Sequence, residues 1–358
     1  MQRLTIALVV HDLHNHGGHA VYTKILADEL SRRHDVAVFA NRCERSSDAR
    51  WKNHQVRASR GSALATVQTF PLGMRQLAST LDDFDIRHMQ GYCGGRPNVV
   101  TAHICVAAYL NSLRAVSPRH RLSLQLMAAA ERRFYRRYKG HVIAVSQKIA
   151  RELQDFYQVQ GSISVIPHGV EHGRFNSDDR LSHRNNLRSQ LGIDHDSIVA
   201  LYVGDLTKSH THVKAVAAAA PEVQFMIVTS SRQYHWNARN VRILPSTPHL
   251  DRYYATADAF IFPTSYDAFG MVILEAMASG LPVFSSECAG AAELIHSGKD
   301  GFVIPLADWV EVTVAALSNR ETLQAVGREA KKTAQQHPWS TVVQEVEKVY
   351  FQIKSDIK

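Results

Sequence analysis

The sequence predicts an α/β protein with two parallel β-sheets, each covered by helices. Short apolar segments alternate with helical patterns along most of the 358 residues, an order typical of parallel sheets. The length suits two domains of about 150–200 residues better than one core. The series of strands starts again after a polar stretch at residues 171–186, which we interpret as the linker between the two domains.

Nearly continuous apolar runs predict the strands, because both faces of a covered parallel sheet are buried. In the first half these runs are residues 5–10, 36–40, 86–89, 99–102 and 142–145. In the second half they are residues 199–203, 224–228, 259–262 and 282–285. Apolar residues three and four apart predict helices at residues 20–31, 212–219, 270–279, 291–296 and 339–358. The predicted domains are therefore residues 1–170 and 171–337, followed by a last helix at 338–358.

Several classes of protein are disfavoured by the composition. No apolar run reaches the roughly 18 residues that a spanning helix needs, and the N-terminal run lacks a cleavage site, so we expect neither a membrane span nor a signal peptide. The four cysteines form no Cys-x-x-Cys pair, which suggests a reducing cytoplasm. The histidines between residues 11 and 19 have no acidic or thiol partner at a familiar spacing, so no metal is expected.

Charge is distributed unevenly between the two halves. Residues 1–170 hold 23 Lys and Arg against 12 Asp and Glu, whereas residues 171–358 hold 18 against 21. This asymmetry predicts an anionic partner for the first half, either a nucleic acid or an anionic membrane. Because no nucleic-acid-binding motif is present, we expect no nucleic-acid partner.

The basic segment 131–139 is the candidate membrane contact. On a helix it would present one broad basic face made of Arg132, Arg133, Arg136 and Arg137. Two interpretations remain open. The face binds anionic lipid headgroups, or it is a solvated helix face whose aromatic residues enter the core.

The most informative stretch is 262–283, where a strand, a loop and a helix follow one another. Asp267 lies in the loop, Gly270 opens the helix, and Glu275 follows Asp267 after seven intervening residues. The amides of Phe269, Gly270 and Met271 are expected to be free at the positive end of the helix, where they favour phosphate or sugar oxygens. The two carboxylates suit the hydroxyls of a sugar or ribose, because each carboxylate accepts two hydrogen bonds.

This stretch resembles the retaining glycosyltransferases of family 4, whose hallmark is an acid, seven residues, Glu, and then Ala-Met-Ala-x-Gly-x-Pro. The resemblance implies the GT-B fold, with two Rossmann-like domains facing across a cleft and a C-terminal helix crossing back to the first domain. It also implies that Glu275 binds the ribose of a nucleotide and that Asp267 contacts the donor sugar. The family usually has Glu where this chain has Asp267, which leaves the identity of the sugar open.

Other segments agree with the resemblance in chain order. Paired glycines, Gly17 and Gly18, link the first strand to the first helix, where the family binds donor phosphates. Gly204 and Lys208 occupy the place of a diphosphate-binding segment. Asp205 stands where an arginine is usual, so the cationic clamp is only half present.

Three further residues complete the candidate site. Arg232, after the next strand, is a second candidate cation. The resemblance places His103, after a first-domain strand, near the transferred sugar. His168 is either architectural or part of the cleft.

Candidate catalytic residues are therefore His103, Asp267 and Lys208. Candidate donor-binding residues are Gly17, Gly18, Gly204, Lys208, Phe269, Gly270, Met271 and Glu275.

The resemblance implies a cytoplasmic enzyme, peripheral on the inner membrane face, that needs no cofactor or metal. It would move a sugar from a nucleotide-diphosphate sugar to an acceptor hydroxyl with retention at the anomeric carbon. The expected acceptor is a glycan or lipid-linked molecule of the envelope, a glycolipid or a secondary metabolite. The alternatives are a catalytically silent nucleotide-sugar-binding module, favoured by Asp205 and Asp267, and a sugar-nucleotide epimerase or phosphorylase on the same fold.

Overall fold

The computed structural model describes residues 2–14, 17–113, 116–176, 180–231 and 233–356. The chain divides into two compact units. Unit 1 comprises Met1–His168 and Trp339–Lys358, and unit 2 comprises Gly169–Pro338. The boundaries predicted from the sequence fall after residues 170 and 337.

Unit 1 is built on a seven-stranded sheet in which every neighbouring pair is parallel, in the order β5-β3-β1-β6-β7-β8-β9. Its strands are β1 (Thr5–Val9), β3 (Asp35–Ala40), β5 (Lys52–Gln55), β6 (Ile86–Gln90), β7 (Val99–Ala102), β8 (His141–Ala144) and β9 (Ile163–Val165). The central strand β1 has four consecutive buried residues, as expected for a strand covered on both faces. A two-stranded ribbon joins β2 (Asp12–Leu13) to β4 (Arg42–Cys43).

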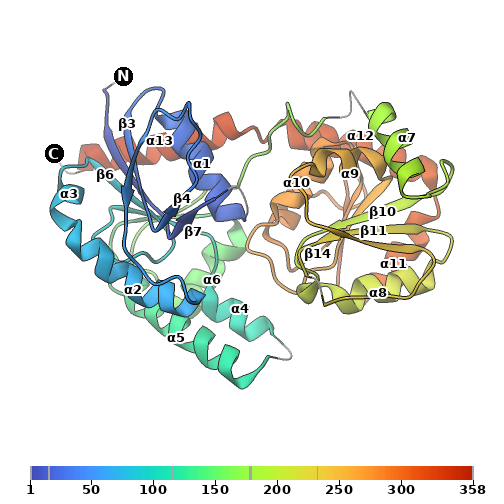
Figure 1. Cartoon of the computed structure of the whole chain (residues 1–358), viewed down its shortest axis with the longest axis horizontal. Coiled ribbons are helices and arrows are strands. Elements are labelled where there is room, and N and C mark those ends of the chain that lie inside the picture. Colours follow the sequence, from blue (N-terminus) through green and yellow to red (C-terminus); the bar gives the residue numbers. More distant parts are fainter. Residues whose placement is uncertain (1, 15–16, 114–115, 177–179, 232, 357–358) are drawn as a thin grey trace. The chain divides into compact units, whose positions relative to one another are not determined.

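Helices cover both faces of this sheet (Figure 1). One layer contains α1 (Gly18–Leu30) and α13 (Trp339–Asp356), which contact each other. The other layer contains α2 (Ala63–Gln76), α4 (Val106–Ser112), α5 (Pro118–Tyr135) and α6 (Gln147–Tyr157), and the short α3 (Ala78–Asp82) follows α2.

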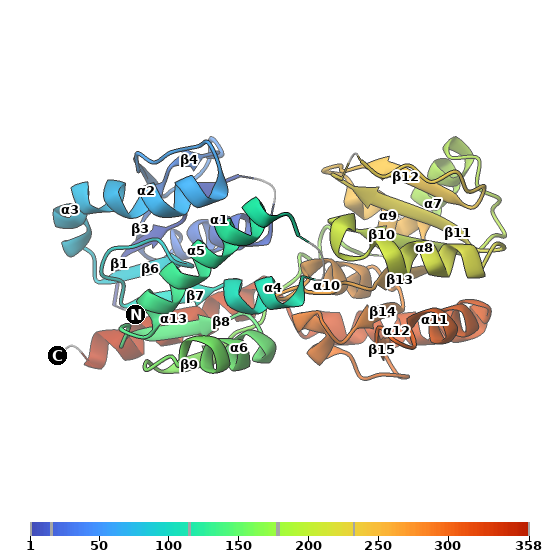
Figure 2. The ribbon, with the colours of Figure 1, turned by 90° about the horizontal axis from the view of Figure 1, so that it is seen from below.

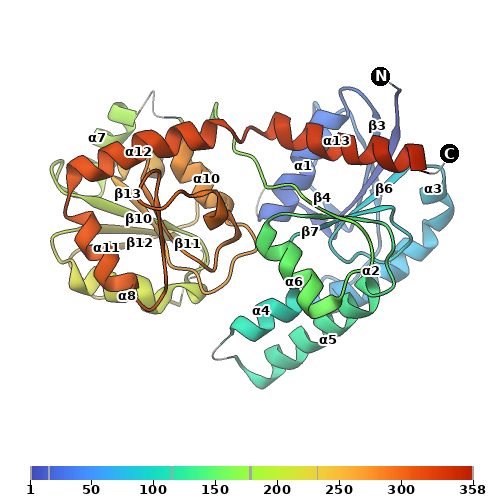
Figure 3. The same ribbon diagram turned by 180° about the vertical axis from the view of Figure 1, so that it is seen from behind.

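The C-terminal helix α13 packs on unit 1, and Figure 3 shows it along its whole length. Two buried polar contacts hold it there. His34 Nε2 lies 2.6 Å from a carboxylate oxygen of Glu347, and His88 Nδ1 lies 2.6 Å from the Tyr350 hydroxyl. Burial lowers the pKa of His88 to about 3, so its ring is neutral and acts through hydrogen bonding alone.

Unit 2 has a second all-parallel sheet of six strands, in the order β12-β11-β10-β13-β14-β15 (Figure 2). These strands are β10 (Val199–Val203), β11 (Gln224–Thr229), β12 (Val241–Pro245), β13 (Ala259–Phe262), β14 (Val283–Ser286) and β15 (Phe302–Ile304). Chain connections run outward in both directions from β10 and β13. The carboxyl ends of these two strands are therefore the topological switch point, the usual ligand position in an open parallel sheet.

The helices of unit 2 also form two layers (Figure 1). One holds α8 (His210–Ala219) and α11 (Trp309–Leu317); the other holds α7 (Arg180–Gln190), α9 (Leu250–Thr256), α10 (Met271–Ala278) and α12 (Arg320–Gln335). Two expectations from the sequence are wrong. The predicted linker 171–186 contains the start of α7, and the helix predicted at 291–296 is a 3₁₀ helix, η2 (Gly290–Leu294).

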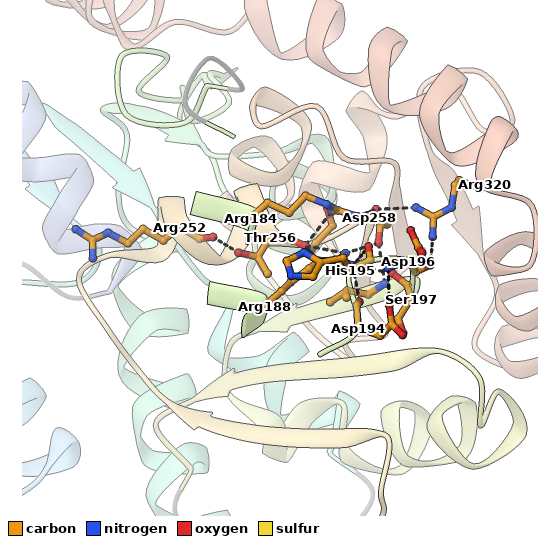
Figure 4. A network of polar contacts seen from close by, with 12 residues as sticks. Arg184, Arg188, Asp194, His195, Asp196, Ser197, Arg252, Thr256, Asp258 and Arg320 are labelled. Atoms are coloured by element: carbon orange, nitrogen blue, oxygen red, sulfur yellow. Dashed lines mark hydrogen bonds and ion pairs between the residues drawn. The ribbon is translucent and has the colours of Figure 1, made fainter. Parts of the chain in front are cut away.

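A buried ion cluster fixes the amino ends of β10 and β13 (Figure 4). Asp258, the residue before β13, pairs with Arg188 at 2.7 Å and with Arg184 at 2.8 Å. It also accepts a 2.9 Å hydrogen bond from the amide of Val199, the first residue of β10. The Arg188 side chain is completely buried, and it donates to carbonyl oxygens on either side, including Thr256 and Ser197. The cluster therefore sets the register of the two strands whose opposite ends carry the candidate site.

Candidate functional site

The candidate residues of unit 2 follow the carboxyl ends of neighbouring strands. The loop after β10 carries Gly204 and Lys208, and the loop after β13 carries Asp267 and Gly270. Glu275 lies in the second turn of α10. The fold thus brings these residues to one edge of one sheet, where parallel sheets bind their ligands.

The loop after β10 is shaped by hydrogen bonds around Asp205. Its carboxylate oxygen Oδ1 accepts from the Thr207 amide at 3.0 Å and from the Ser231 hydroxyl at 2.9 Å. Burial raises the pKa of Asp205, but these hydrogen bonds outweigh burial and leave the pKa below its usual value. Asp205 is thus a charged group that organises the loop from within.

Lys208 ends the short 3₁₀ turn η1 (Leu206–Lys208), and its backbone oxygen accepts a 3.0 Å hydrogen bond from the Ser265 amide. That bond ties the loop after β10 to the loop after β13. It therefore places the backbone of Lys208 beside the loop that leads to Gly270. Arg232, the second candidate cation, lies outside the described residues.

The loop after β13 is held in place through its backbone. The Asp267 amide donates to Cys288 at 3.1 Å, and its carbonyl accepts from Gly290 at 3.1 Å. Gly270 adopts a φ of 89° and precedes α10 directly, a conformation that side chains other than glycine's rarely tolerate. This turn aims the start of α10 at the carboxyl edge of the sheet.

The three amides predicted to be free differ from one another. The Phe269 amide donates a 3.2 Å hydrogen bond to Asp267 Oδ1, so the expectation that it is free is wrong. Within the described residues, no hydrogen bond from the amides of Gly270 or Met271 is present. Those two amides therefore remain available to an anion at the positive end of α10.

Glu275 is half-buried, and burial raises its pKa above the usual range. Its oxygen Oε2 accepts a 2.9 Å hydrogen bond from the hydroxyl of Tyr254 in α9, and Tyr254 has no exposed surface. The carboxylate is therefore oriented by a rigid donor, and its second oxygen is left for a ligand hydroxyl. The sequence motif identified Glu275 but gave no signal for Tyr254, which comes from another helix.

In unit 1, Gly17 caps the N-terminus of α1 with a φ of 83°. Gly17 and Gly18 are both exposed. No acidic residue lies in the first turn of α1, so the positive end of this helix is not neutralised locally.

His103 follows β7 and is fixed by Gln90. Its Nε2 lies 2.9 Å from the Gln90 amide oxygen. With the Gln90 amide in this orientation, Nε2 donates the hydrogen bond and Nδ1 is the acceptor. Nδ1 is buried without a hydrogen-bond partner. Burial, followed by the neighbouring His168, moves the pKa of His103 well below its usual value. The ring is thus a neutral acceptor.

His168 is 4% exposed. Its ring centroid lies 5.1 Å from that of Tyr22 and 5.9 Å from that of Trp339. These aromatic contacts make His168 part of the packing between α1 and α13, which agrees with its architectural interpretation.

The basic segment lies at the end of α5. The helix ends at Tyr135, so Arg136 and Arg137 occupy the following turn rather than the helix, but all four arginines are exposed. Tyr138 is buried and Phe134 is half-buried. Leu122 and Leu126, one turn apart on the same helix, are 57% and 45% exposed. The end of α5 therefore combines buried aromatics with exposed arginines, and two leucines earlier in the helix are exposed as well.

The described residues form no group of three or more His, Cys, Asp or Glu side chains that could hold a metal ion. Over the same ranges, every helix is too short or too polar to cross a membrane.

Solved structures share this architecture. The chain aligns with WaaG, a glycosyltransferase involved in lipopolysaccharide biosynthesis, with a TM-score of 0.81 at 20% identity, over 95% of this chain and 98% of that one. It aligns with Anabaena HepE in complex with UDP-glucose with a TM-score of 0.72 at 17% identity, over 98% of this chain and 100% of that one. These similarities identify the fold as GT-B.

Sequence comparison defines the family. Residues 16–174 match the model for glycosyltransferase family 4, and residues 197–319 match the model for glycosyl transferases group 1. A D-inositol 3-phosphate glycosyltransferase from Nocardia farcinica is 25% identical over 244 residues, which is 60% of this chain and 51% of that enzyme. The chain thus spans about half the length of this relative. It belongs to the family 4 glycosyltransferases.

Proposed function

We propose that the chain transfers a sugar from a nucleoside-diphosphate sugar to an acceptor hydroxyl, with retention at the anomeric carbon. The observation that carries this proposal is the arrangement at the start of α10. There, Glu275 is oriented by Tyr254, and the amides of Gly270 and Met271 lie one turn before it. The carboxylate suits the ribose hydroxyls and the amides suit the diphosphate, so a nucleoside diphosphate needs both features side by side. The UDP-glucose complex of HepE supports a donor of this class.

The departing diphosphate develops negative charge in the transition state. In the proposed reaction, Lys208 and the free amides before α10 stabilise this charge, so that no metal is required. Gly17 and Gly18 would bring the positive end of α1 to the diphosphate and so stabilise the same charge. His103, a neutral acceptor, would orient a sugar hydroxyl, and Asp267 would bind hydroxyls of the donor sugar. Because no described residue is assigned as the nucleophile or the general base that a double displacement needs, we propose that the leaving phosphate takes the acceptor proton on the same face of the sugar.

We further propose that the acceptor belongs to an envelope glycan, a glycolipid or a secondary metabolite, and that the protein works at the cytoplasmic face of the membrane. The role of WaaG in lipopolysaccharide biosynthesis supports a lipid-linked acceptor. The exposed leucines of α5 and the exposed arginines at its end and in the following turn support contact with an anionic bilayer.

A donor screen tests the proposal. A nucleoside-diphosphate sugar present at a hundred times its dissociation constant should stabilise the protein by about 2.7 kcal/mol, seen as a raised melting temperature. The best donor should then be hydrolysed slowly without acceptor, and this activity should survive EDTA. If no such donor stabilises the protein, the proposal is wrong. Complete loss of activity with EDTA, reversed by added metal, would refute metal independence.

Asp205 favours a second candidate, a nucleotide-sugar-binding module without catalysis. Its carboxylate occupies the place of an expected cation, and it is held there by Thr207 and Ser231. Donor binding without hydrolysis or transfer would support this candidate over the enzyme.

A further inference from the structure

The short segment that carries His103 leads into a helix whose first amides need outside partners. Ala102 ends β7, and α4 begins at Val106. The thiol of Cys105, the N-cap residue, donates to the carbonyl of Glu152 instead of capping the helix. The amides of a first helical turn have no acceptor within their own helix. The start of α4 therefore depends on acceptors from other elements.

Two neighbouring helices supply these acceptors, and α4, α5 and α6 contact one another (Figure 3). Glu131 Oε2, from α5, accepts a 3.0 Å hydrogen bond from the Val106 amide. The Tyr157 hydroxyl, from α6, accepts a 3.0 Å hydrogen bond from the Ala107 amide, and it donates a 2.7 Å hydrogen bond to Glu131 Oε2. One carboxylate and one tyrosine thus cap the positive end of α4 from outside.

Glu131 occupies a position in α5 that suits an apolar residue. It belongs to the buried stripe that also contains Leu124, Ala128 and Tyr135, and it is 6% exposed. Val106 packs against Leu124 and Ala128 in one hydrophobic cluster. Burial raises the pKa of Glu131 to about 7, so its charge costs stability in this stripe. What the carboxylate gains there over an apolar side chain is its hold on the start of α4.

The uncharged titratable groups that face Glu131 keep their protons around pH 7. Cys105 lies beside it at the start of α4, and burial raises the pKa of this thiol to about 12. Burial also raises the pKa values of Tyr157 in α6 and of Tyr135 in α5 further above neutral pH. A change of charge near pH 7 in this cluster therefore belongs to Glu131.

Charged side chains of the neighbouring helices form no ion pair with Glu131 in the part of the chain that the structure describes. In α6, Glu152 pairs with Lys148 at 2.6 Å, and its charge acts on Cys105. In α2, which also contacts α5, Arg75 is exposed. The pKa of Glu131 is therefore set by burial, which raises it, and by the hydrogen bonds from Tyr157 and the Val106 amide, which lower it.

We propose that Glu131 is a positioning residue for the transfer reaction, because its carboxylate fixes the start of α4 and thereby the segment that carries His103. This role rests on the proposed function, in which His103 orients a sugar hydroxyl. A charged acceptor makes hydrogen bonds roughly twice as strong as a neutral one. Protonation of Glu131 should therefore weaken the cap of α4, let the His103 segment move and slow the chemical step.

The pH dependence of kcat tests this role in the full chain. The reaction measured is hydrolysis of whichever of UDP-glucose, ADP-glucose and GDP-glucose binds best, at saturating donor for each pH. Saturation separates two residues, because Glu275 is proposed to govern donor affinity, whereas Glu131 should change kcat and leave the Kd of the donor unchanged. In wild type, kcat should fall as pH decreases through about 7, the pKa of Glu131.

Three substitutions separate the charge of Glu131 from its shape. Glu131→Gln keeps a neutral acceptor of the same shape, so its kcat should lose the acid limb and lie about 5–10-fold below wild type at about pH 8.5. Glu152→Gln removes a carboxylate from the adjacent helix that pairs with Lys148, and as the matched control it should keep the limb. Tyr157→Phe keeps the ring stacked on Tyr135 but removes the hydroxyl that lowers the pKa of Glu131, so the limb should move to higher pH.

Thermal unfolding gives a readout that needs no activity. The pKa of Glu131 is higher in the folded protein than in the unfolded chain, so its contribution to stability is lost as pH rises through about 7. Glu131→Gln cannot lose this contribution. Its melting temperature should therefore rise relative to that of wild type between about pH 6 and pH 8.5.

The outcomes separate this role from the proposed function. If Glu131→Gln keeps the wild-type limb, or if the limb stays in place in Tyr157→Phe, the role of Glu131 is wrong and the proposed function stands. Loss of the limb in Glu152→Gln would also overturn the role, because any nearby charge would then have the same effect. So would a melting-temperature difference between Glu131→Gln and wild type that does not change with pH. If wild type binds and hydrolyses no nucleoside-diphosphate sugar, the proposed function fails and the role of Glu131 fails with it.

Discussion

The Tyr254 hydroxyl donates a 2.9 Å hydrogen bond to the carboxylate of Glu275. The two residues come from consecutive helices, α9 and α10, and the tyrosine is completely buried. A carboxylate that is half-buried and already oriented loses little freedom when a ligand hydroxyl binds to it. This pair therefore presents a pre-oriented carboxylate in the candidate donor site.

Glu275→Ala should remove the hydrogen bonding proposed to the ribose and weaken transition-state stabilisation by about 2–4 kcal/mol. Tyr254→Phe keeps the carboxylate and removes only its orienting donor, so it should cost about 0.5–1.5 kcal/mol. Calorimetry with the preferred nucleoside diphosphate and steady-state kinetics measure both. If Glu275→Ala binds the donor as tightly as wild type does, Glu275 does not bind the ribose.

The same pair predicts a pH dependence. Burial raises the pKa of Glu275, so donor affinity should fall with decreasing pH earlier than it would for an ordinary glutamate. The Tyr254 hydrogen bond lowers that pKa, and Tyr254→Phe should therefore move the acid limb of the affinity profile to higher pH. The pKa of Glu275 is higher in the folded protein than in the unfolded chain. Its contribution to the free energy of unfolding is therefore lost as pH rises through the folded pKa. If the acid limb does not move in Tyr254→Phe, Tyr254 does not influence the pKa of Glu275.

Asp267→Glu restores the acid that is more usual in the family. The added methylene acts where the donor sugar is proposed to bind, so preference among donor sugars should change more than nucleotide affinity. Competing nucleoside-diphosphate sugars in one transfer assay measure the preference, and calorimetry with the free nucleoside diphosphate provides the control. A shift in nucleotide affinity at constant sugar preference would place Asp267 at the wrong end of the donor.

Asp258→Asn should destabilise unit 2, because it leaves the buried Arg188 without its anionic partner. Breaking one partner of a buried pair costs about 3–5 kcal/mol, measurable by urea unfolding. Asp35→Asn is the matched control, since its pair with Arg3 is exposed and such pairs contribute about 0–1 kcal/mol. Similar effects of the two substitutions would mean that the cluster does not fix the strands.

Features that depend on a short, continuous stretch of sequence were predicted correctly. The strands at residues 199–203 and 259–262 are confirmed to the residue, because an apolar run that is buried on both faces has few alternatives. The positions of Asp267, Gly270 and Glu275 follow from one continuous motif.

Tertiary contacts between distant residues carry no such local signal. Tyr254 is 21 residues from Glu275, and Ser231 is 26 residues from Asp205. Sequence reasoning could not pair them without knowing how the helices and loops pack.

The last prediction concerns the exposed face of α5. Unit 1 contains the half of the chain with 23 basic against 12 acidic residues over positions 1–170. Two of its exposed arginines lie in the last turn of this helix and two in the turn that follows it. Each basic residue near an anionic surface contributes about 1 kcal/mol, reduced by salt. The exposed Leu122 and Leu126 can add apolar contact with the interface. We therefore expect vesicles with anionic lipid to bind the protein at low salt and to release it as salt rises.

Two sets of substitutions separate charge from apolar insertion. Reversing Arg132, Arg133, Arg136 and Arg137 to Glu should abolish co-sedimentation with anionic vesicles. Leu122→Ser with Leu126→Ser should weaken it and leave its salt dependence in place. Both variants should keep wild-type affinity for nucleoside diphosphate, because that site is proposed in unit 2. Equal binding to neutral and anionic vesicles, or no effect of the four reversals, would make this face a solvated surface and would favour a soluble acceptor.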